Sequence, residues 1–320
     1  MSAIATSLVS FLKPGDVLLF SNPIYGGTHK FIHFMLRNWG VTPIGFNAGD
    51  SKEKIIDMIR QENAGDALRM IYVETPANPT NDLIDIGMCR DIAEHFSNAE
   101  KKVYVAVDNT YMGPLWAHPL KHGADIVLYS ATKYIGGHSD LIAGAAVGSR
   151  EIIKTIKKSR TVFGTMIDPH TSWLLMRSLE TLKIRMEAAA QNAAVIAEYL
   201  SNHPKVTKVY YLGYTEKNNP AQADLVKKQY LSFGAMLSFD VYGGEKEAFQ
   251  FLNNLKHIKL AVSLGGTESL AEHPFSMTHA DVPTEEKNRL GLTENMIRLS
   301  VGIEHHRDLI DDIEQALKTI

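Results

Sequence analysis

Three polar side chains stand just beyond apolar runs, where they could share one chemical task. Asn78 lies in TPANP after the run IYVE, Asp108 follows VYVAV, and Lys133 follows IVLY in the stretch SATKYIGGHSD. A lysine shielded from water loses its proton more easily, so its amine can form a Schiff base with an aldehyde. An aspartate that pairs with a ring nitrogen completes the arrangement that enzymes use for pyridoxal phosphate. The sequence therefore predicts a site for this cofactor.

Each of the three residues also has an ordinary structural explanation. An aspartate after a strand usually caps a helix or turn, a lysine there is usually a charge at the rim, and asparagine between prolines is typical of a turn. The chemical interpretation depends on their convergence, because ligands bind beyond the carboxyl ends of the strands of an open parallel sheet. Ser130 and Thr132 flank the lysine with hydroxyls that suit a phosphate, and Tyr25 in NPIYGGT can stack on a ring.

The elements that would carry these residues alternate between strands and helices. Apolar runs predict strands at 17–20, 42–46, 69–75, 102–109, 124–133 and 142–149, and amphipathic or capped stretches predict helices at 3–12, 29–40, 51–62 and 85–96. Near-continuous apolar strands separated by helices are typical of a parallel sheet that is covered on both faces.

The remainder of the chain predicts a second, smaller α+β domain. A long helical stretch at 169–202 would join the two domains, followed by strands at 205–213, 234–241 and 258–266 and helices at 244–255 and 306–320. The predicted division is a large domain at 1–180, which would bind the cofactor, and a C-terminal α+β domain at 181–320.

The composition is that of a globular protein with a large core. The chain has 320 residues, of which 45% are hydrophobic and 22% charged. Its formal charge of −3 gives no electrostatic reason to expect nucleic acid or an anionic membrane as a partner. No apolar run is long enough to span a bilayer, and the first residues lack the basic region of a signal peptide.

Cysteine and histidine usage gives no sign of a metal site. The single cysteine, Cys89, excludes an intrachain disulfide and a Cys-rich zinc site, and it is consistent with a cytoplasmic location. The histidines, His138 and His279 among them, show no spacing typical of a metal-binding helix. We therefore predict that the site uses no metal.

Seven motifs, taken together in order, resemble those of one enzyme family. They are IYGGT (24–28), ETPANPT (74–80), VDNTY (107–111), SATKYIGGHSD (130–140), AVSLGGTESL (261–270), HPFSMTHA (273–280) and IRLSVGIE (297–304). On these motifs the chain resembles, along its whole length, the Cys/Met-metabolism (trans-sulfuration) family of pyridoxal-phosphate-dependent enzymes. The resemblance implies an α/β fold of the aspartate-aminotransferase-like type (fold type I), with a mostly parallel sheet flanked by helices, and pyridoxal 5'-phosphate as cofactor.

The resemblance implies a role for each residue that matches a cofactor-binding motif. Lys133 would bind the cofactor as a Schiff base and then move protons as general base and acid. Asp108 would pair with the pyridine nitrogen and keep it protonated. Tyr25 would stack on the ring and assist catalysis, and Ser130 and Thr132 would bind the phosphate.

The same resemblance implies three substrate-binding residues. Arg298 in IRLSVG would hold the α-carboxylate of the substrate, because a guanidinium fork suits a carboxylate. Asn78 and Ser263 would lie beside the cofactor and that carboxylate. Without the motif, a surface salt bridge would be the simpler explanation of the arginine.

The resemblance leaves the reaction open between elimination and replacement. The family includes cystathionine γ-lyase, methionine γ-lyase, cystathionine β-lyase, cystathionine γ-synthase and O-acylhomoserine sulfhydrylase. Gly27 stands where methionine γ-lyases typically carry cysteine. We expect γ-elimination from a small sulfur amino acid, cystathionine or methionine, and keep γ-replacement on an O-acylhomoserine as the alternative. An inactive homologue, or another pyridoxal enzyme of the same fold such as an aminotransferase, is a further alternative.

Measured against the family, the sequence starts late. Met1 matches the Met of a Ser-Gly-Met motif, where a helix N-terminus would present N–H groups to the cofactor phosphate. Family members carry an earlier arm that donates a Tyr and an Arg to a neighbouring subunit. We therefore expect an incomplete sequence that lacks the N-terminal segment, and a homo-oligomer, the family tetramer, that would be weakened if the protein is truly this short.

Overall fold

The computed structural model describes residues 1–280 and 282–320, and the chain forms two compact units. The first contains residues 1–78, 82–131 and 142–171. The second contains residues 79–81, 132–141 and 172–320. The division into a cofactor-binding domain at 1–180 and a C-terminal domain at 181–320 stays a prediction, because compactness does not assign a function to either part.

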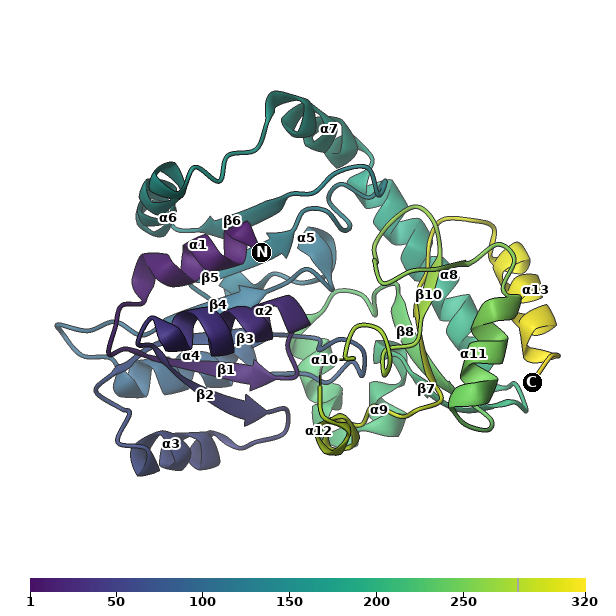
Figure 1. Ribbon diagram of the computed structural model, residues 1–320, viewed down its shortest axis with the longest axis horizontal. Coiled ribbons are helices and arrows are strands. Elements are labelled where there is room, and N and C mark those ends of the chain that lie inside the picture. The colour runs from purple at the N-terminus through teal and green to yellow at the C-terminus, as the bar shows by residue number, and fades with distance from the viewer. Residues whose placement is uncertain (281) are drawn as a thin grey trace. The chain divides into compact units, whose positions relative to one another are not determined.

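The first unit is built on a six-stranded sheet in the order β2-β1-β3-β4-β5-β6. Its strands are β1 (Val17–Asn22), β2 (Thr42–Asn47), β3 (Leu68–Glu74), β4 (Tyr104–Asp108), β5 (Ile126–Ser130) and β6 (Gly144–Gly148). Neighbours from β2 to β5 run parallel, and β6 is antiparallel to β5. The prediction of a mostly parallel sheet flanked by helices is therefore confirmed (Figure 1).

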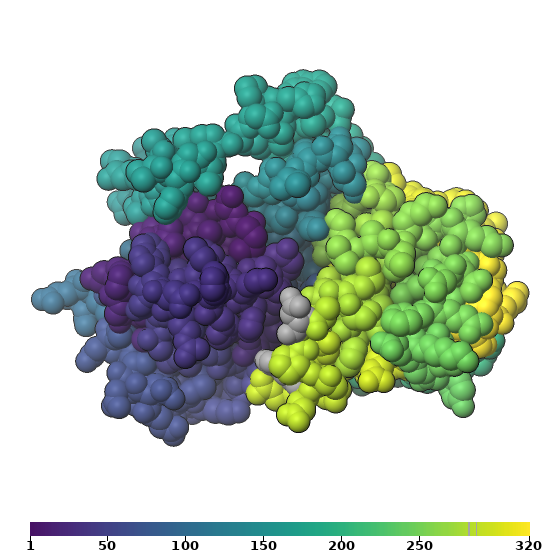
Figure 2. All heavy atoms as spheres, viewed as in Figure 1, coloured from purple at the N-terminus to yellow at the C-terminus, as the bar shows by residue number. Residues whose placement is uncertain are grey.

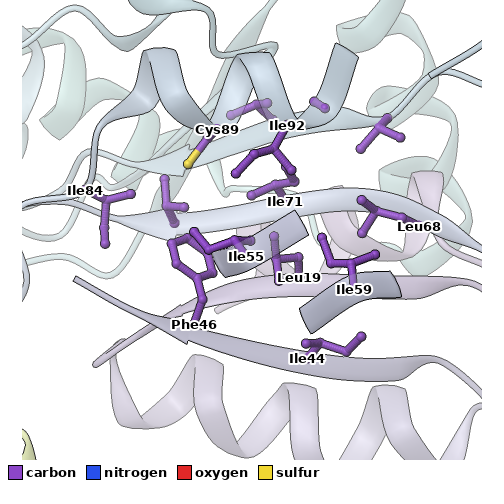
Figure 3. Close-up of a cluster of buried hydrophobic side chains, with 14 of the residues drawn as sticks. Leu19, Ile44, Phe46, Ile55, Ile59, Leu68, Ile71, Ile84, Cys89 and Ile92 are labelled. Atoms are coloured by element: carbon purple, nitrogen blue, oxygen red, sulfur yellow. The ribbon is translucent and has the colours of Figure 1, made fainter. Parts of the chain in front are cut away.

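Helices cover both faces of this sheet, because successive strand residues point to opposite sides. Leu19 of β1 packs on the face that α3 and α4 cover, and Cys89 lies in the same cluster (Figure 3). Leu18 and Tyr72 pack on the other face, with α1, α6 and a π-helical segment at Phe31–Leu36. The helices are α1 (Ser2–Phe11), α2 (Gly26–Lys30), α3 (Lys52–Gln61), α4 (Ile86–Phe96), α5 (Gly113–Trp116) and α6 (Arg150–Phe163).

Local capping explains where several of these helices begin. Ser51 accepts a hydrogen bond from the backbone N–H of Lys54 at the start of α3, and Asp85 caps α4 in the same way. Ser149 caps α6, a helix that the sequence analysis did not assign. In the space-filling view α6 (teal) packs beside α1 (purple), and the Ser10 hydroxyl donates to that of Ser159 (Figure 2).

The second unit contains a five-stranded sheet in the order β7-β8-β11-β10-β9. It is antiparallel except for the short pair of β9 and β10. Its elements are α8 (Leu182–Ser201), β7 (Val206–Tyr210), α9 (Thr215–Asn218), α10 (Ala223–Gln229), β8 (Met236–Val241), α11 (Glu245–Asn254), β9 (Lys259–Leu260), β10 (Leu270–Glu272), α12 (Thr284–Arg289), β11 (Met296–Ser300) and α13 (His306–Leu317). This arrangement matches the expected α+β fold, although the second unit is not smaller than the first.

Two predicted elements differ from the structure. The stretch 169–202 is not one helix but two, α7 (Pro169–Glu180) and α8, because the backbone of Thr181 leaves the helical conformation. The predicted strand at 258–266 is reduced to the two residues of β9. Gly265 adopts a φ of +71°, a left-handed conformation that ends an extended run.

Candidate active site

The carboxyl ends of β3, β4 and β5 meet at one edge of the first sheet, because these strands are parallel neighbours. Asp108 ends β4, and it lies opposite Glu74, which ends β3. Ser130 ends β5, and its backbone N–H donates to the Thr110 hydroxyl at 2.7 Å. The N–H of Thr110 donates in turn to the Asp108 carboxylate at 3.0 Å. The edge therefore links two of the predicted site residues, Asp108 and Ser130, through Thr110.

Asp108 is a buried carboxylate held by hydroxyl and amide donors. Tyr72 lies on the neighbouring strand β3, and its hydroxyl donates to the second carboxylate oxygen of Asp108 at 3.3 Å. Burial raises the pKa of Asp108, and the hydrogen bonds from Thr110 and Tyr72 oppose that rise. Within the part of the chain that the structure describes, no lysine or arginine side chain forms an ion pair with this carboxylate. A cationic ring nitrogen is the kind of partner that such a group stabilises.

Glu74 is a second buried acid at this edge, and the sequence analysis did not single it out. Its carboxylate accepts the backbone N–H of Tyr25 at 2.8 Å. Burial, reinforced by the charge of Asp108, raises the pKa of Glu74 to about 8, against hydrogen bonds from the N–H groups of Tyr25 and Asn78. The sequence does contain a sign of its importance, since Glu74 is the first residue of the motif ETPANPT. Glu74 thus brings the segments of two predicted site residues together.

The raised pKa of Glu74 predicts a pH-dependent stability of the cofactor-free chain. Between pH 4.5 and about 8 the folded state keeps a proton that the unfolded state releases. The free energy of unfolding should therefore fall as the pH rises through this window, by up to about 1.4 kcal/mol per pH unit. Glu74→Gln should flatten the decline, measured by denaturant unfolding from pH 5 to 8. Glu94→Gln, an exposed change on α4, is the control, and equal slopes for both variants would contradict the prediction.

The start of α2 fixes the position of Tyr25. Tyr25 is the residue that precedes the helix, and its side chain is 53% exposed, which leaves the ring open for stacking. Gly27 leaves room for this ring, because a Cβ there would lie 2.6 Å from a Tyr25 ring carbon and the ring would have to shift. Thus the predicted aromatic residue has an accessible face, and the glycine beside it permits that position.

In the second unit, Lys133 lies in a turn and its amine is half-buried. Its Nζ donates to the Ser263 hydroxyl at 3.0 Å, which brings two predicted site residues together. Burial lowers the pKa of Lys133, and the positive charge of Arg298 lowers it further, while Glu272 opposes both. More of the amine is therefore unprotonated at neutral pH than for an exposed lysine, as a nucleophilic amine requires. Thr132 directly precedes it in the same unit.

Arg298 on β11 is almost completely buried, so it is not the surface salt bridge that was the alternative. Its Nη1 pairs with Glu272 on the adjacent β10 at 2.5 Å, and both side chains are at most 1% exposed. Its Nη2 donates to the backbone oxygens of Val262 at 3.0 Å and Ser263 at 2.8 Å. Ser263 therefore contacts Lys133 through its hydroxyl and Arg298 through its carbonyl. Glu272, which the sequence analysis missed, directly precedes the motif HPFSMTHA.

The described residues provide neither a metal site nor a membrane-spanning helix. No group of three His, Cys, Asp or Glu side chains among residues 1–280 and 282–320 is placed to hold a metal ion. Over the same residues, no helix has the length and apolar character needed to cross a membrane. The two sets of residues offer a half-buried amine with a lowered pKa, buried acids and a buried guanidinium.

The fold and these residues define the class of fold type I pyridoxal-phosphate enzymes. The solved cystathionine γ-lyase from Lactobacillus plantarum, complexed with L-serine, superposes with a TM-score of 0.90 at 35% identity, covering 100% of this chain and 80% of that one. Cystathionine γ-synthase from Xanthomonas oryzae pv. oryzae, in complex with cystathionine, gives 0.90 at 34% identity, covering 100% and 79%.

The sequence comparison gives the family directly. The model of the Cys/Met metabolism PLP-dependent enzymes matches residues 1–318, and the chain belongs to this family. It is 41% identical to cystathionine γ-lyase of Bacillus subtilis, covering 100% of this chain and 80% of that protein. It is 38% identical to L-methionine γ-lyase of Pseudomonas putida, covering 99% and 77%. The chain is thus a pyridoxal-phosphate-dependent enzyme that acts on small sulfur amino acids.

The residues present fit this cofactor. Asp108 is a buried carboxylate whose burial raises its pKa, and a protonated ring nitrogen would relieve that cost. Lys133 offers an amine whose pKa is lowered. The hydroxyls of Ser130 and Thr132, on either side of Ala131, are hydrogen-bond donors suited to a phosphate.

Proposed function

We propose that this enzyme catalyses γ-elimination from a sulfur amino acid, cystathionine or methionine. The observation that carries the proposal is the half-buried amine of Lys133, which Ser263 holds and whose pKa is lowered by burial and by the charge of Arg298. An amine of this kind can take and return a proton at the α-carbon of an amino acid near neutral pH. Relatives named cystathionine γ-lyase and L-methionine γ-lyase support the choice of substrate.

Each site residue has one task in this proposal. When bound, pyridoxal phosphate supplies an aldehyde for an amine and a ring that withdraws electrons from the substrate. Lys133 would hold the aldehyde carbon and later move protons. Asp108 would keep a proton on the ring nitrogen, Tyr25 would stack on the ring, and Ser130 and Thr132 would bind the phosphate.

The substrate would be held by the other predicted residues. Arg298 would bind the α-carboxylate, since its guanidinium is fixed by Glu272 and by two backbone oxygens. Ser263 would orient the Lys133 amine, and Asn78 would lie beside the cofactor. Elimination then requires removal of a proton from the α-carbon and of another from the β-carbon, so the Lys133 amine would have to give up the first proton before it takes the second.

Arg298→Lys should raise KM roughly 10- to 100-fold, since about 1.5–3 kcal/mol is lost with a charged two-point hydrogen-bonding partner. Lysine keeps the positive charge beside Glu272, so no buried acid is left without a cation. Steady-state kinetics measures the change, and an absorbance titration should show that cofactor affinity changes much less. An unchanged KM would move the carboxylate site elsewhere.

The experiment that tests the function is an absorbance spectrum of the chain with added pyridoxal phosphate, followed by borohydride reduction and peptide mapping. We expect the reduced cofactor on Lys133 and release of an α-keto acid and ammonia from cystathionine or methionine. If no peptide carries the cofactor, the proposal is wrong for this chain, and an inactive homologue is the better interpretation. Transamination with 2-oxoglutarate would instead indicate an aminotransferase.

Replacement at the γ-carbon is the second candidate. It is favoured by the likeness to solved cystathionine γ-synthases, with TM-scores of 0.91 and 0.90. An O-acylhomoserine supplied with cysteine, and separately with sulfide, distinguishes the two reactions. Thioether formation faster than keto-acid release would assign the enzyme to synthesis.

We also infer that the chain assembles into a homo-oligomer, a tetramer as in the family, in the cytoplasm. Large apolar side chains on its surface support assembly, because such side chains mark protein–protein interaction sites where they gather into a patch. Between residues 162 and 184 the exposed ones are Val162, Phe163, Met166, Ile167, Trp173, Met176, Leu179 and Ile184. Light scattering tests the assembly, and cell fractionation tests the location.

A further inference from the structure

A buried arginine on α8 holds the backbone of the turn that follows the reactive lysine. Arg185 is only 6% exposed. Its Nη1 donates to the backbone oxygen of Tyr134 at 2.9 Å, and its Nη2 reaches that of Ile135 at 3.4 Å. Nη2 also donates to the backbone oxygen of Ser178 at 2.9 Å, and Nε donates to the Thr181 hydroxyl at 3.1 Å. The guanidinium therefore joins the turn to the junction of α7 and α8.

The bonding partners of Arg185 indicate a positional task. In the described part of the chain no carboxylate forms an ion pair with it, and its acceptors are backbone and hydroxyl oxygens. Burying a cation without a counter-charge is costly, so the hydrogen bonds must compensate for lost water. One of these acceptors is the backbone oxygen of Tyr134, the residue directly after Lys133. These hydrogen bonds fix the backbone of the turn at Tyr134.

Gly137 completes the arrangement. Its N–H donates to the backbone oxygen of Lys133 at 2.7 Å and closes the turn. Its φ is +68°, and a Cβ there would lie 1.8 Å from Nη1 of Arg185. Any side chain at this position must therefore displace the guanidinium or open the turn.

The opposite side of the turn rests against the loop that contains Ser263. A Cβ on Gly265 would lie 2.9 Å from the backbone nitrogen of Tyr134. The N–H of Thr267 donates to the backbone oxygen of Gly137 at 2.9 Å. The turn is thus held between this loop and Arg185, and Lys133 reaches Ser263 from within it.

We propose that Arg185, together with Gly137, is a positioning element that clamps the Lys133 turn so that the lysine amine stays directed at Ser263. The inference deepens the proposed function and rests on Lys133 being the reactive amine. Arg185 acts through the backbone and does not touch the substrate. A misplaced reacting group can slow a reaction roughly 100-fold for a displacement of about 1 Å, so the effect should fall on kcat.

The variants are Arg185→Ala, Arg185→Lys and Gly137→Ala, with Arg177→Ala as the control. Arg177 is a half-exposed arginine on α7 that pairs loosely with Asp140 at 3.7 Å, so its loss removes an arginine from the same region and leaves the bonds of Arg185 to the turn present. In the holoenzyme we expect kcat to fall roughly 100-fold for Arg185→Ala and Gly137→Ala, with KM little changed. Free guanidinium ion at millimolar concentration should partly restore Arg185→Ala. It should not restore Gly137→Ala, where the added methyl group occupies the space.

A second readout needs no cofactor. Pulsed acetylation of the chain over a pH series, read at the Lys133 peptide by mass spectrometry, gives the midpoint at which the amine becomes reactive. The charged groups that face this amine are Arg298 on β11 and Glu272 on β10, and none of the variants replaces either of them. Burial lowers the pKa of Lys133, so release of the turn should move the midpoint to higher pH in Arg185→Ala and not in Arg177→Ala.

The outcomes separate the two levels of inference. If wild type traps the cofactor on Lys133 and Arg185→Ala matches Arg177→Ala in both kcat and midpoint, the clamp is refuted. If wild type traps no cofactor, the proposed function fails, while the acetylation midpoints still decide about the clamp. Should Arg185→Ala not fold, Arg185→Lys carries the test, because it keeps the charge and stem and loses only the fork. A wild-type midpoint and kcat in that variant would equally refute the proposal.

Discussion

Lys133→Ala is expected to abolish turnover and the visible absorbance of the bound cofactor together. The amine would hold the cofactor and also move the protons, so its loss removes covalent attachment and general acid–base catalysis in one step. The latter alone typically contributes 10²- to 10⁴-fold. Folding should be spared, because the amine is half-buried next to Arg298 and its removal takes away a costly cation.

The measurement pairs steady-state kinetics with the spectrum and with thermal unfolding. Lys154→Ala is the matched control, since Lys154 is an exposed lysine on α6. The control should keep the colour and the rate of wild type. Persistence of both in Lys133→Ala would show that another amine does the chemistry, and peptide mapping after borohydride reduction would identify it.

Asp108→Asn is expected to remove most activity, by roughly 10²- to 10³-fold, while the fold becomes no less stable. A neutral amide no longer favours a proton on the ring nitrogen, so the electron-withdrawing power of the ring falls. At the same time the charge of Asp108 is one cause of the raised pKa of Glu74. Its removal should lower the pKa of Glu74 toward the ordinary value, and the decline of stability with pH should become shallower.

The loss of activity and the shallower decline of stability with pH together distinguish a chemical role of Asp108 from a structural one. Rates and denaturant unfolding are measured at pH 6 and pH 8, with Asp91→Asn as the control because Asp91 is an exposed carboxylate on α4. Near-normal turnover of Asp108→Asn would leave Asp108 as a residue that only orders Thr110 and Tyr72. A large loss of stability would point the same way.

The strands of the first unit and most of the helices that cover them were predictable because local signals and burial agree there, whereas α6 was not assigned. The strands are continuous apolar runs that alternate between two buried faces, and Ser51 caps α3 through a local hydrogen bond. Polar residues at the ends of such strands converge by geometry alone, so Asp108 and Ser130 could be expected at one edge. The family motifs supplied what geometry does not, namely the task of each residue.

The residues missed were those whose importance depends on contacts distant in sequence. From the sequence alone, Glu74 is only the last residue of a strand. Its importance follows from the hydrogen bond that it accepts from the N–H of Tyr25, 49 residues away. Glu272 likewise gains its meaning from pairing with Arg298 across two antiparallel strands. No proline or glycine in the sequence marks the break between α7 and α8. It lies where Arg185 binds Ser178 and Thr181.

The two compact units are interlaced along the chain, which passes between them at 78/79, 81/82, 131/132, 141/142 and 171/172. Neither unit is therefore encoded by one uninterrupted stretch of gene. The ten-residue excursion at 132–141, which carries Lys133, leaves between the adjacent strands β5 and β6 and returns to them. A single cut in the coding sequence cannot release either half intact. The segment that carries Lys133 therefore cannot be exchanged as part of a contiguous module without also interrupting the sheet of the first unit.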